Sequence, residues 1–163
     1  MAKNKEEKTN VMRVLEQKKI AYTAHTYPHE EGMAVDGVTV AQSMGFDPAI
    51  VFKTLVARGA SKRYYVFDVP VAENLDLKKA AKAVGEKSIE MIHQKELLPL
   101  TGYVHGGCSP VGMKKLFPTV FHETAENLAA MIVSAGKIGY QVELAPHDLA
   151  ALVRAKFADI IVE

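Results

Sequence analysis

The chain has 163 residues, of which 48% are hydrophobic and 24% are charged, a composition typical of one globular domain spanning residues 1–163. Its 20 Lys and Arg against 19 Asp and Glu give a net charge of +1, so no global positive field marks a nucleic-acid binder, and contact with RNA requires a local patch. A single cysteine excludes an internal disulfide framework, and no apolar stretch is long enough to cross a bilayer. We therefore expect a cytoplasmic protein with no membrane contact.

The spacing of apolar residues and the positions of Gly and Pro predict about seven or eight short strands and four or five helices. In chain order, we expect a helix at about 7–18, a strand at 20–27, a helix at 36–45, strands at 50–58 and 63–70, a helix at 74–85, a strand at 88–92, a helix at 93–98, strands at 118–122, 131–135 and 140–144, a helix at 145–156 and a closing strand at 158–162.

Local signals set some of these boundaries. Asp47 before Pro48 resembles a helix N-cap with proline in the first turn. Pro99 is expected to end the helix at 93–98. The glycines of "SAGKIG", residues 134–139, suit a hairpin connection between two strands.

The order of the elements differs from the strict alternation of a doubly wound parallel sheet. It predicts a mixed α+β fold in which a curled, mixed and largely antiparallel sheet, or a barrel, is flanked by helices. No internal repeat or linker-like stretch divides the chain, which supports a single domain.

Lys53 interrupts an otherwise apolar strand, Val51–Val56. A buried ammonium group is costly unless it reaches water, a carboxylate or an anionic ligand. Two interpretations weigh about equally: the methylenes pack while the ammonium stays in water, or the lysine faces a ligand at the open end of the sheet. Strand alternation predicts that Thr54 faces the opposite side and does not share a pocket with Lys53.

The stretch "VHGGCSPVGMKK", residues 104–115, is rich in glycine and holds the only cysteine. Gly107 and Gly112 have the spacing of a P-loop, but Met113 stands where its lysine belongs and no Ser or Thr follows for magnesium, which argues against nucleotide-triphosphate chemistry. Backbone without side chains at Gly106 and Gly107 lets N–H groups approach a ligand, as in an oxyanion hole. A tight turn is at least as common an explanation.

Cys108 is a candidate nucleophile, because His105, Lys114 and Lys115 lie close to it in sequence. A catalytic thiol needs a base or a positive environment, however, and a lone cysteine is more often a small buried apolar residue, which is the interpretation we favour. The six histidines show no spacing typical of zinc ligands. We expect no metal and no other cofactor.

Six segments occur in a specific order: "HTY", "VFKTL", "LDLKKAAKAVG", "GYVHGGCSPVG", "VSAGKIG" followed by "VEL", and "AKFADI". Over about Val11–Ile160 they resemble the YbaK/EbsC family of aminoacyl-tRNA deacylases, which is also similar to the editing domain of bacterial prolyl-tRNA synthetases. The resemblance implies a YbaK-like fold, a mixed barrel-like sheet flanked by helices. It also implies mischarged tRNA(Pro) as substrate and prolyl-tRNA synthetase as partner.

The resemblance assigns catalytic roles to three residues. Lys53 matches the family's lysine near the tRNA end and the aminoacyl ester, and Gly106 and Gly107 begin the GxxxP loop whose backbone amides hold the scissile carbonyl. The residues expected to contact the substrate are Tyr27, Cys108, Ser109, Pro110, Ser134 and Gln141.

The family's cysteine-specific members, which act on Cys-tRNA(Pro), need no protein nucleophile. The substrate's own thiol attacks its ester carbonyl, cyclises and releases the tRNA 3′ end. This chain departs from the family pattern at Gln141, where an acidic residue is expected; an amide can form hydrogen bonds but carries no charge. Glu143 lies two residues further along the same strand face and is not an equivalent replacement.

Two other functions stay open. The same chemistry can act on another aminoacyl group, such as that of Ala-tRNA(Pro), and a panel of mischarged tRNAs separates these substrates. A non-catalytic module that binds tRNA or a synthetase would show saturable binding without deacylation.

Overall fold

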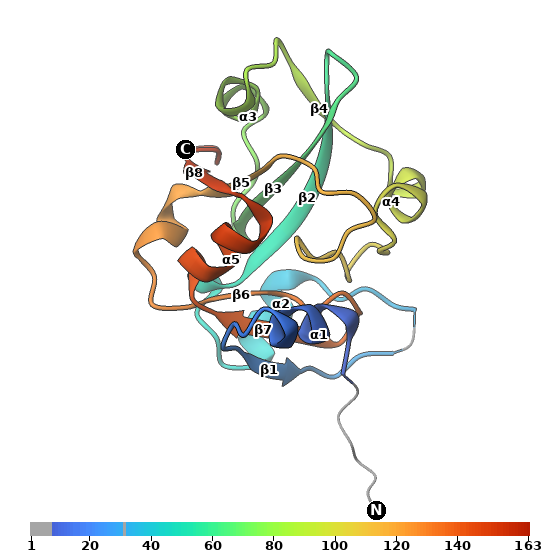
Figure 1. The fold of residues 1–163 in the computed structure, drawn as a ribbon, viewed down its shortest axis with the longest axis vertical. Helices are drawn as coiled ribbons and strands as arrows, with labels where there is room; N and C mark the ends of the chain where they lie inside the picture. The colour runs from blue at the N-terminus through green and yellow to red at the C-terminus, as the bar shows by residue number, and fades with distance from the viewer. Residues whose placement is uncertain (1–7, 31) are drawn as a thin grey trace, which may run out of the picture.

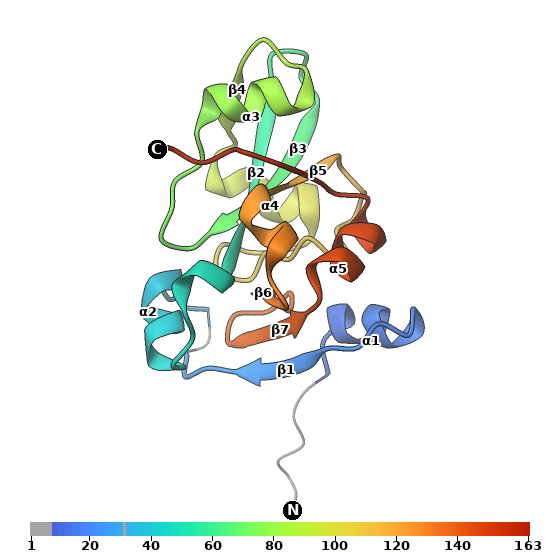
Figure 2. The same ribbon diagram turned by 90° about the vertical axis from the view of Figure 1, so that its left-hand side faces the viewer.

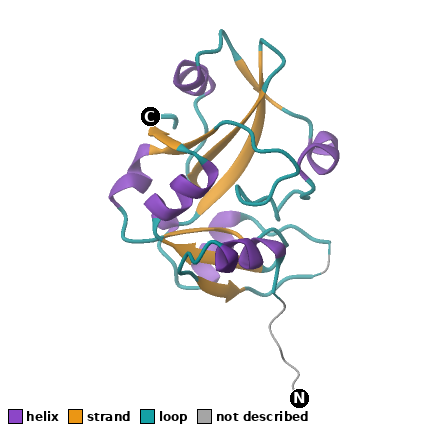
Figure 3. Cartoon of the chain, viewed as in Figure 1, coloured by secondary structure: helices purple, strands orange, loops and turns teal. Residues whose placement is uncertain are grey.

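The computed structural model describes residues 8–30 and 32–163, which form two β-sheets and five α-helices (Figure 1, Figure 3). The small sheet has the antiparallel order β1-β7-β6, and the large sheet has the mixed order β4-β2-β3-β5-β8. The strands are β1 Thr23–Thr26, β2 Phe52–Gly59, β3 Tyr64–Pro70, β4 Ile89–Met91, β5 Thr119–His122, β6 Met131–Ser134, β7 Tyr140–Leu144 and β8 Lys156–Ala158.

Helices cover both sheets. They are α1 Asn10–Gln17, α2 Gly37–Ser43, α3 Leu77–Val84, α4 Gln94–Thr101 and α5 Pro146–Val153, with short 3₁₀ turns at Pro48–Ile50 and Glu123–Asn127. The largest core cluster joins α1 and α5 to the small sheet, and α2 packs in a separate cluster with Ile132 of β6. A third cluster joins α3 to the large sheet, and a fourth packs α4 and Cys108 against β2 and β3. None of the described helices is long and apolar enough to cross a membrane.

The prediction of a mixed, largely antiparallel α+β fold flanked by helices is confirmed, but the strands form two sheets and no barrel. The parallel pairings are β3 with β5 and β5 with β8. The two sheets lie one beyond the other along the long axis of the molecule (Figure 1, Figure 2), and a parallel bridge from Val51 to Ile132 joins them. The large sheet stays open, with β4 and β8 at its two edges, and β4 pairs only with Ala57–Gly59 of β2.

Side-chain caps explain most of the helix starts. The Asp47 cap is confirmed, because its carboxylate accepts the Ala49 N–H at 2.9 Å. The first helix begins later than expected, at Asn10, because the Thr9 hydroxyl accepts the Met12 N–H and sets the N-terminus there. The expected start at Glu7 lies outside the described residues.

The expectation that Pro99 ends the fourth helix is wrong. Helix α4 continues through Pro99 to Thr101, where the Thr101 hydroxyl donates to Leu97 O at 2.7 Å. Proline lacks the N–H donor and its ring crowds the carbonyl of Lys95, but only two helical residues follow it before the helix ends. Gly102, in the left-handed conformation with φ of 89°, ends the helix.

The closing strand at 158–162 is also wrong in its placement. The last strand, β8, is three residues long at Lys156–Ala158, and beyond it Ile161 forms an isolated bridge to Leu75. This segment is apolar because it is buried, and not because it pairs with a neighbouring strand. Ile160 is completely buried in the core cluster that includes α3.

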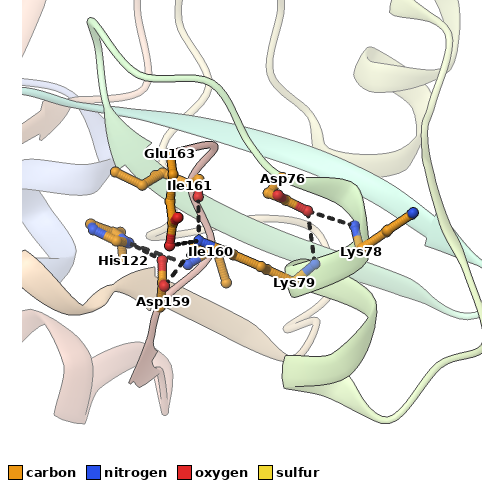
Figure 4. A network of polar contacts seen from close by, with 8 residues as sticks. All are labelled: Asp76, Lys78, Lys79, His122, Asp159, Ile160, Ile161 and Glu163. Carbon is orange, nitrogen blue, oxygen red and sulfur yellow. Dashed lines mark hydrogen bonds and ion pairs between the residues drawn. The ribbon is translucent and has the colours of Figure 1, made fainter.

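Side chains hold this C-terminal segment (Figure 4). The Lys79 ammonium, on α3, donates to Asp159 Oδ2 at 3.0 Å and to Glu163 Oε2 at 3.3 Å. From β5, His122 Nδ1 accepts the Ile160 N–H at 3.3 Å, which requires that nitrogen to be unprotonated. Burial lowers the pKa of His122 and favours this neutral form.

We predict that Ile160→Ala lowers the free energy of unfolding by about 3 kcal/mol, because a fully buried aliphatic side chain leaves a cavity when it is truncated. The matched control is Ile161→Ala, a neighbour that is only partly buried and should cost clearly less. Urea denaturation of both variants measures the difference. Equal losses would contradict the anchoring role of Ile160.

Candidate functional site

A cavity of ≈540 Å³ lies between β2 of the large sheet, the β6–β7 hairpin of the small sheet and the glycine-rich loop. Six of the nine residues predicted from sequence line it: Tyr27, Lys53, Gly106, Cys108, Ser134 and Gln141. The other three, Gly107, Ser109 and Pro110, do not line it.

Both glycines of the loop are required by close contacts. Gly106 has φ of 89°, and a Cβ atom there would lie 2.7 Å from the Cβ of Ala34. A Cβ atom on Gly107 would lie 3.0 Å from the backbone nitrogen of Ile138, in the β6–β7 connection. The loop therefore fits closely between two other segments, and side chains at these positions would push it away from them.

Two backbone amides of the loop have no acceptor within the described part of the chain. The Gly107 N–H donates to Val104 O at 2.9 Å, so it is already engaged in a turn. Among the described residues no group accepts a hydrogen bond from the N–H of Gly106 or of Cys108, and both residues line the cavity. An oxyanion site in this loop would therefore use the amides of Gly106 and Cys108 and not that of Gly107.

Buried polar contacts hold the loop in place from behind. Ser109 is fully buried, and its hydroxyl accepts the Val111 N–H at 3.2 Å. The Tyr103 hydroxyl donates to the carbonyl of Val111. Burial raises the pKa of Tyr103 to about 12, so the phenol keeps the proton that it donates. These residues support the loop and do not reach the cavity.

The ammonium group of Lys53 is available to an anionic ligand. The side chain is half-buried in the cavity wall, and burial lowers its pKa, while the charges of Asp36 and Glu73 act in the opposite direction. No carboxylate of the described residues lies within ion-pair distance of Lys53, in contrast to Lys79. Of the two interpretations of this strand lysine, the geometry favours the ligand-facing one.

Thr54 also lines the cavity, contrary to the expectation that it would not share a pocket with Lys53. The two side chains do lie on opposite faces of β2. However, β4 pairs only with Ala57–Gly59, so the edge of β2 near Lys53 is open on that side and the cavity can reach both faces.

Asp68 is a buried acid that the sequence reasoning missed. It is the cross-strand partner of Thr54, whose hydroxyl donates to Asp68 Oδ1 at 2.5 Å. Its other oxygen, Oδ2, has no hydrogen-bond partner among the described residues. Burial raises the pKa of this fully buried carboxyl to about 7. The signal was present, because Asp68 interrupts the apolar strand β3 as Lys53 interrupts β2.

Cys108 lies in an apolar environment that suppresses its reactivity. Its side chain packs with Val56, Val66 and Phe117. Burial, together with the negative charge of Asp68, raises the pKa of the thiol to about 12. A thiol in this state is protonated at neutral pH and is a poor nucleophile.

Gln141 brings a second unpartnered oxygen to the cavity. It lies on β7 between His25 and Ser134 of the neighbouring strands, and it is only 7% exposed. Its Oε1 has no hydrogen-bond partner among the described residues. Glu143 does not replace the missing acid, since it pairs with His25 Nε2 at 2.8 Å and does not line the cavity.

Among residues 8–30 and 32–163 there is no group of three or more His, Cys, Asp and Glu that could hold a metal ion. The groups that line the cavity are the Lys53 ammonium, the Asp36 carboxylate, the His105 imidazole, the free amides of Gly106 and Cys108, and the hydroxyl and amide groups of residues such as Thr54 and Gln141.

Comparison with known proteins gives consistent results. A family model described as "Aminoacyl-tRNA editing domain" matches residues 29–152. A protein of Enterococcus faecalis described as "Putative Cys-tRNA(Pro)/Cys-tRNA(Cys) deacylase EbsC" is 47% identical over 161 residues, which are 98% of this chain and 98% of that protein.

Two solved structures are similar over nearly the whole chain. "Crystal structure of a putative trans-editing enzyme for prolyl tRNA synthetase" has a TM-score of 0.79 at 26% identity and covers 94% of this chain and 95% of that one. "Crystal structure of hypothetical protein APE2540" has a TM-score of 0.82 at 18% identity, covers 93% of this chain and 99% of that one, and indicates the fold alone.

We predict that Asp68→Asn gains stability relative to the parent chain as the pH rises. Between about pH 4 and pH 7 the folded parent holds a proton on Asp68 that the unfolded chain has released, so its free energy of unfolding falls as the pH increases. Asparagine does not titrate. The stability difference should therefore grow by up to about 3 kcal/mol between pH 5 and pH 8 in urea denaturation. A difference that is constant with pH would show that Asp68 ionises normally.

Proposed function

Because the chain belongs to the aminoacyl-tRNA editing domain family, we propose that it is a deacylase that removes cysteine from mischarged Cys-tRNA(Pro). One observation carries the proposal: the unpaired ammonium of Lys53 and the free amides of Gly106 and Cys108 surround one cavity. The name of the Enterococcus faecalis relative supports the same substrate.

In the proposed reaction the nucleophile belongs to the substrate. The cysteinyl sulfur attacks the ester carbonyl of its own aminoacyl group, so that an S–C bond forms and the ester C–O bond breaks. The thiol proton passes through solvent to the leaving ribose oxygen, and the products are a thiolactone and free tRNA. Water then opens the thiolactone to cysteine.

The glycine-rich loop would stabilise the charge that develops on the carbonyl oxygen. The N–H groups of Gly106 and Cys108 have no acceptor among the described residues, so they could bind the oxyanion without first breaking a protein hydrogen bond. A single donor of this kind contributes about 3–4 kcal/mol in known enzymes. The cavity also holds the thiol near the carbonyl, which reduces the entropic cost of cyclisation.

Lys53 would bind the tRNA end of the substrate. Its ammonium lies in the cavity wall without a carboxylate partner, and the 3′-terminal nucleotide brings a phosphate and the leaving oxygen. A cation at this position attracts the phosphate and also stabilises negative charge on the ribose oxygen as the C–O bond breaks.

A partner synthetase would supply much of the tRNA affinity. The net charge of +1 provides little general attraction to phosphate, whereas a solved relative is described as a trans-editing enzyme for prolyl tRNA synthetase. We propose that prolyl-tRNA synthetase delivers the mischarged tRNA. Selectivity for the aminoacyl group would come from the cavity, although one methylene is worth only about 1–3 kcal/mol.

We predict that Lys53→Ala lowers the rate of Cys-tRNA(Pro) deacylation by at least about 100-fold, because the variant loses the cation near the leaving oxygen. The matched control is Cys108→Ser, which should stay active because the protein thiol takes no part. Radiolabelled substrate measures the rates, and thermal melting confirms that both variants fold. Undiminished turnover in Lys53→Ala, or loss of activity in folded Cys108→Ser, would contradict these roles.

A panel of mischarged tRNAs tests the mechanism through the substrate. Cys-tRNA(Pro) should be deacylated at least about 10-fold faster than Ser-tRNA(Pro), since a hydroxyl is a much weaker nucleophile than a thiol of similar size. Ala-tRNA(Pro), which has neither group, should not react. Efficient turnover of Ala-tRNA(Pro) would require an activated water and would exclude cyclisation, whereas binding without any deacylation would indicate a non-catalytic module.

A further inference from the structure

Two buried side-chain oxygen atoms, one in the cavity wall and one on the strand next to it, have no hydrogen-bond donor to pair with. Within the described residues, the buried side-chain atoms without a hydrogen-bond partner are Asp68 Oδ2 and Gln141 Oε1. Gln141 lines the cavity, and Asp68 lies directly behind Thr54, which also lines it. An unpaired buried acceptor costs about 1–3 kcal/mol, so the free oxygen of Gln141 in the cavity wall favours a ligand that brings a hydrogen-bond donor, and Asp68 can act on such a ligand only through Thr54.

The hydrogen bond between Thr54 and Asp68 decides what Thr54 can offer to a ligand. A threonine hydroxyl has one proton and two lone pairs. Since the proton is donated to Asp68 Oδ1, Thr54 Oγ1 has only its lone pairs left for the cavity. Thr54 is therefore an acceptor backed by a buried carboxylate.

When Asp68 ionises, no cationic group of the described residues compensates its charge. Lys53 is on the opposite face of β2, and no cationic group of the described residues affects the pKa of Asp68. The negative charge of Asp68 raises the pKa of the Cys108 thiol, which stays neutral. The residue of β5 opposite Asp68 is the apolar Phe121. A buried negative charge without a partner favours a cationic ligand group over a neutral hydroxyl or the weak S–H donor.

We propose that Thr54, positioned by Asp68 and joined by Gln141 from the small sheet, forms the subsite for the α-ammonium group of the aminoacyl ester. This inference rests on the proposed deacylase function. Thr54 and Gln141 contact the ammonium, whereas Asp68 acts through Thr54 as a positioning residue.

The subsite orients the substrate in the cavity. Lys53 repels the α-ammonium and attracts the phosphate, whereas Thr54 accepts a hydrogen bond from the ammonium. These neighbouring residues lie on opposite faces of β2. The two charged parts of the substrate are thus sorted to the two sides of one strand. A further consequence is that the enzyme acts on aminoacyl esters with a free amino group and excludes N-acylated esters such as peptidyl-tRNA.

The test compares two substrates that both carry the thiol, Cys-tRNA(Pro) and 3-mercaptopropionyl-tRNA(Pro), which lacks the amino group. Thr54→Val keeps the shape of the side chain and removes the hydroxyl. It should lower kcat/KM for Cys-tRNA(Pro) by roughly 10- to 100-fold, the effect of losing one hydrogen bond to a charged group, but change that for the desamino substrate by less than about threefold. Thr54→Ser, which keeps the hydroxyl, should retain activity on both.

Asp68→Asn provides a second, independent readout. The ratio of kcat/KM for Cys-tRNA(Pro) between parent and variant should rise with pH through about pH 7, as Asp68 ionises and Thr54 becomes a fixed acceptor. The same ratio for the desamino substrate should stay flat. Melting curves confirm that each variant folds.

The outcomes separate failure of the ammonium subsite from failure of the proposed deacylase function. If the parent turns over Cys-tRNA(Pro) but Thr54→Val loses the same factor on both substrates, or loses nothing, the ammonium subsite is wrong and the deacylase function stands. If the parent turns over neither substrate, both the proposed function and the subsite are overturned.

Discussion

The site depends on one constraint in the large sheet: β4 covers only the second half of β2. The first half of β2 has an open edge, and the small sheet meets it through the bridge from Val51 to Ile132. This arrangement leaves a cavity where Lys53 and Thr54, on opposite faces of one strand, are both accessible.

The second component of the site is backbone rather than a reactive side chain. The glycine-rich loop is fixed on one side by contact of Gly106 with Ala34 and on the other by Gly107 against the β6–β7 connection. Its cysteine is buried among apolar residues, where a thiolate is unfavourable. A site of this kind would suit the proposed mechanism, in which the substrate supplies the nucleophile.

The sequence was informative where a local signal has one structural meaning. Asp47 before Pro48 predicted its cap, and the ordered motifs identified the family that the comparison confirms. Lys53 in an apolar strand marked a position of interest, although the sequence left its two interpretations equal. The sequence was not informative where packing against distant segments determines the position or pairing of a residue. Thr54 lines the cavity only because β4 is short, and the segment at 158–162 is apolar because it packs under α3, not because it pairs in a ladder.

The identity of the first product of Cys-tRNA(Pro) deacylation tests most directly whether the substrate supplies the nucleophile. In a single turnover with enzyme in excess, mass spectrometry of samples taken at early times separates cysteine thiolactone from cysteine. Cyclisation predicts that the thiolactone appears first and then decays to cysteine as tRNA is released. Cysteine formed from the earliest time, with no thiolactone, would show that water or a protein group attacks the ester and would contradict the mechanism.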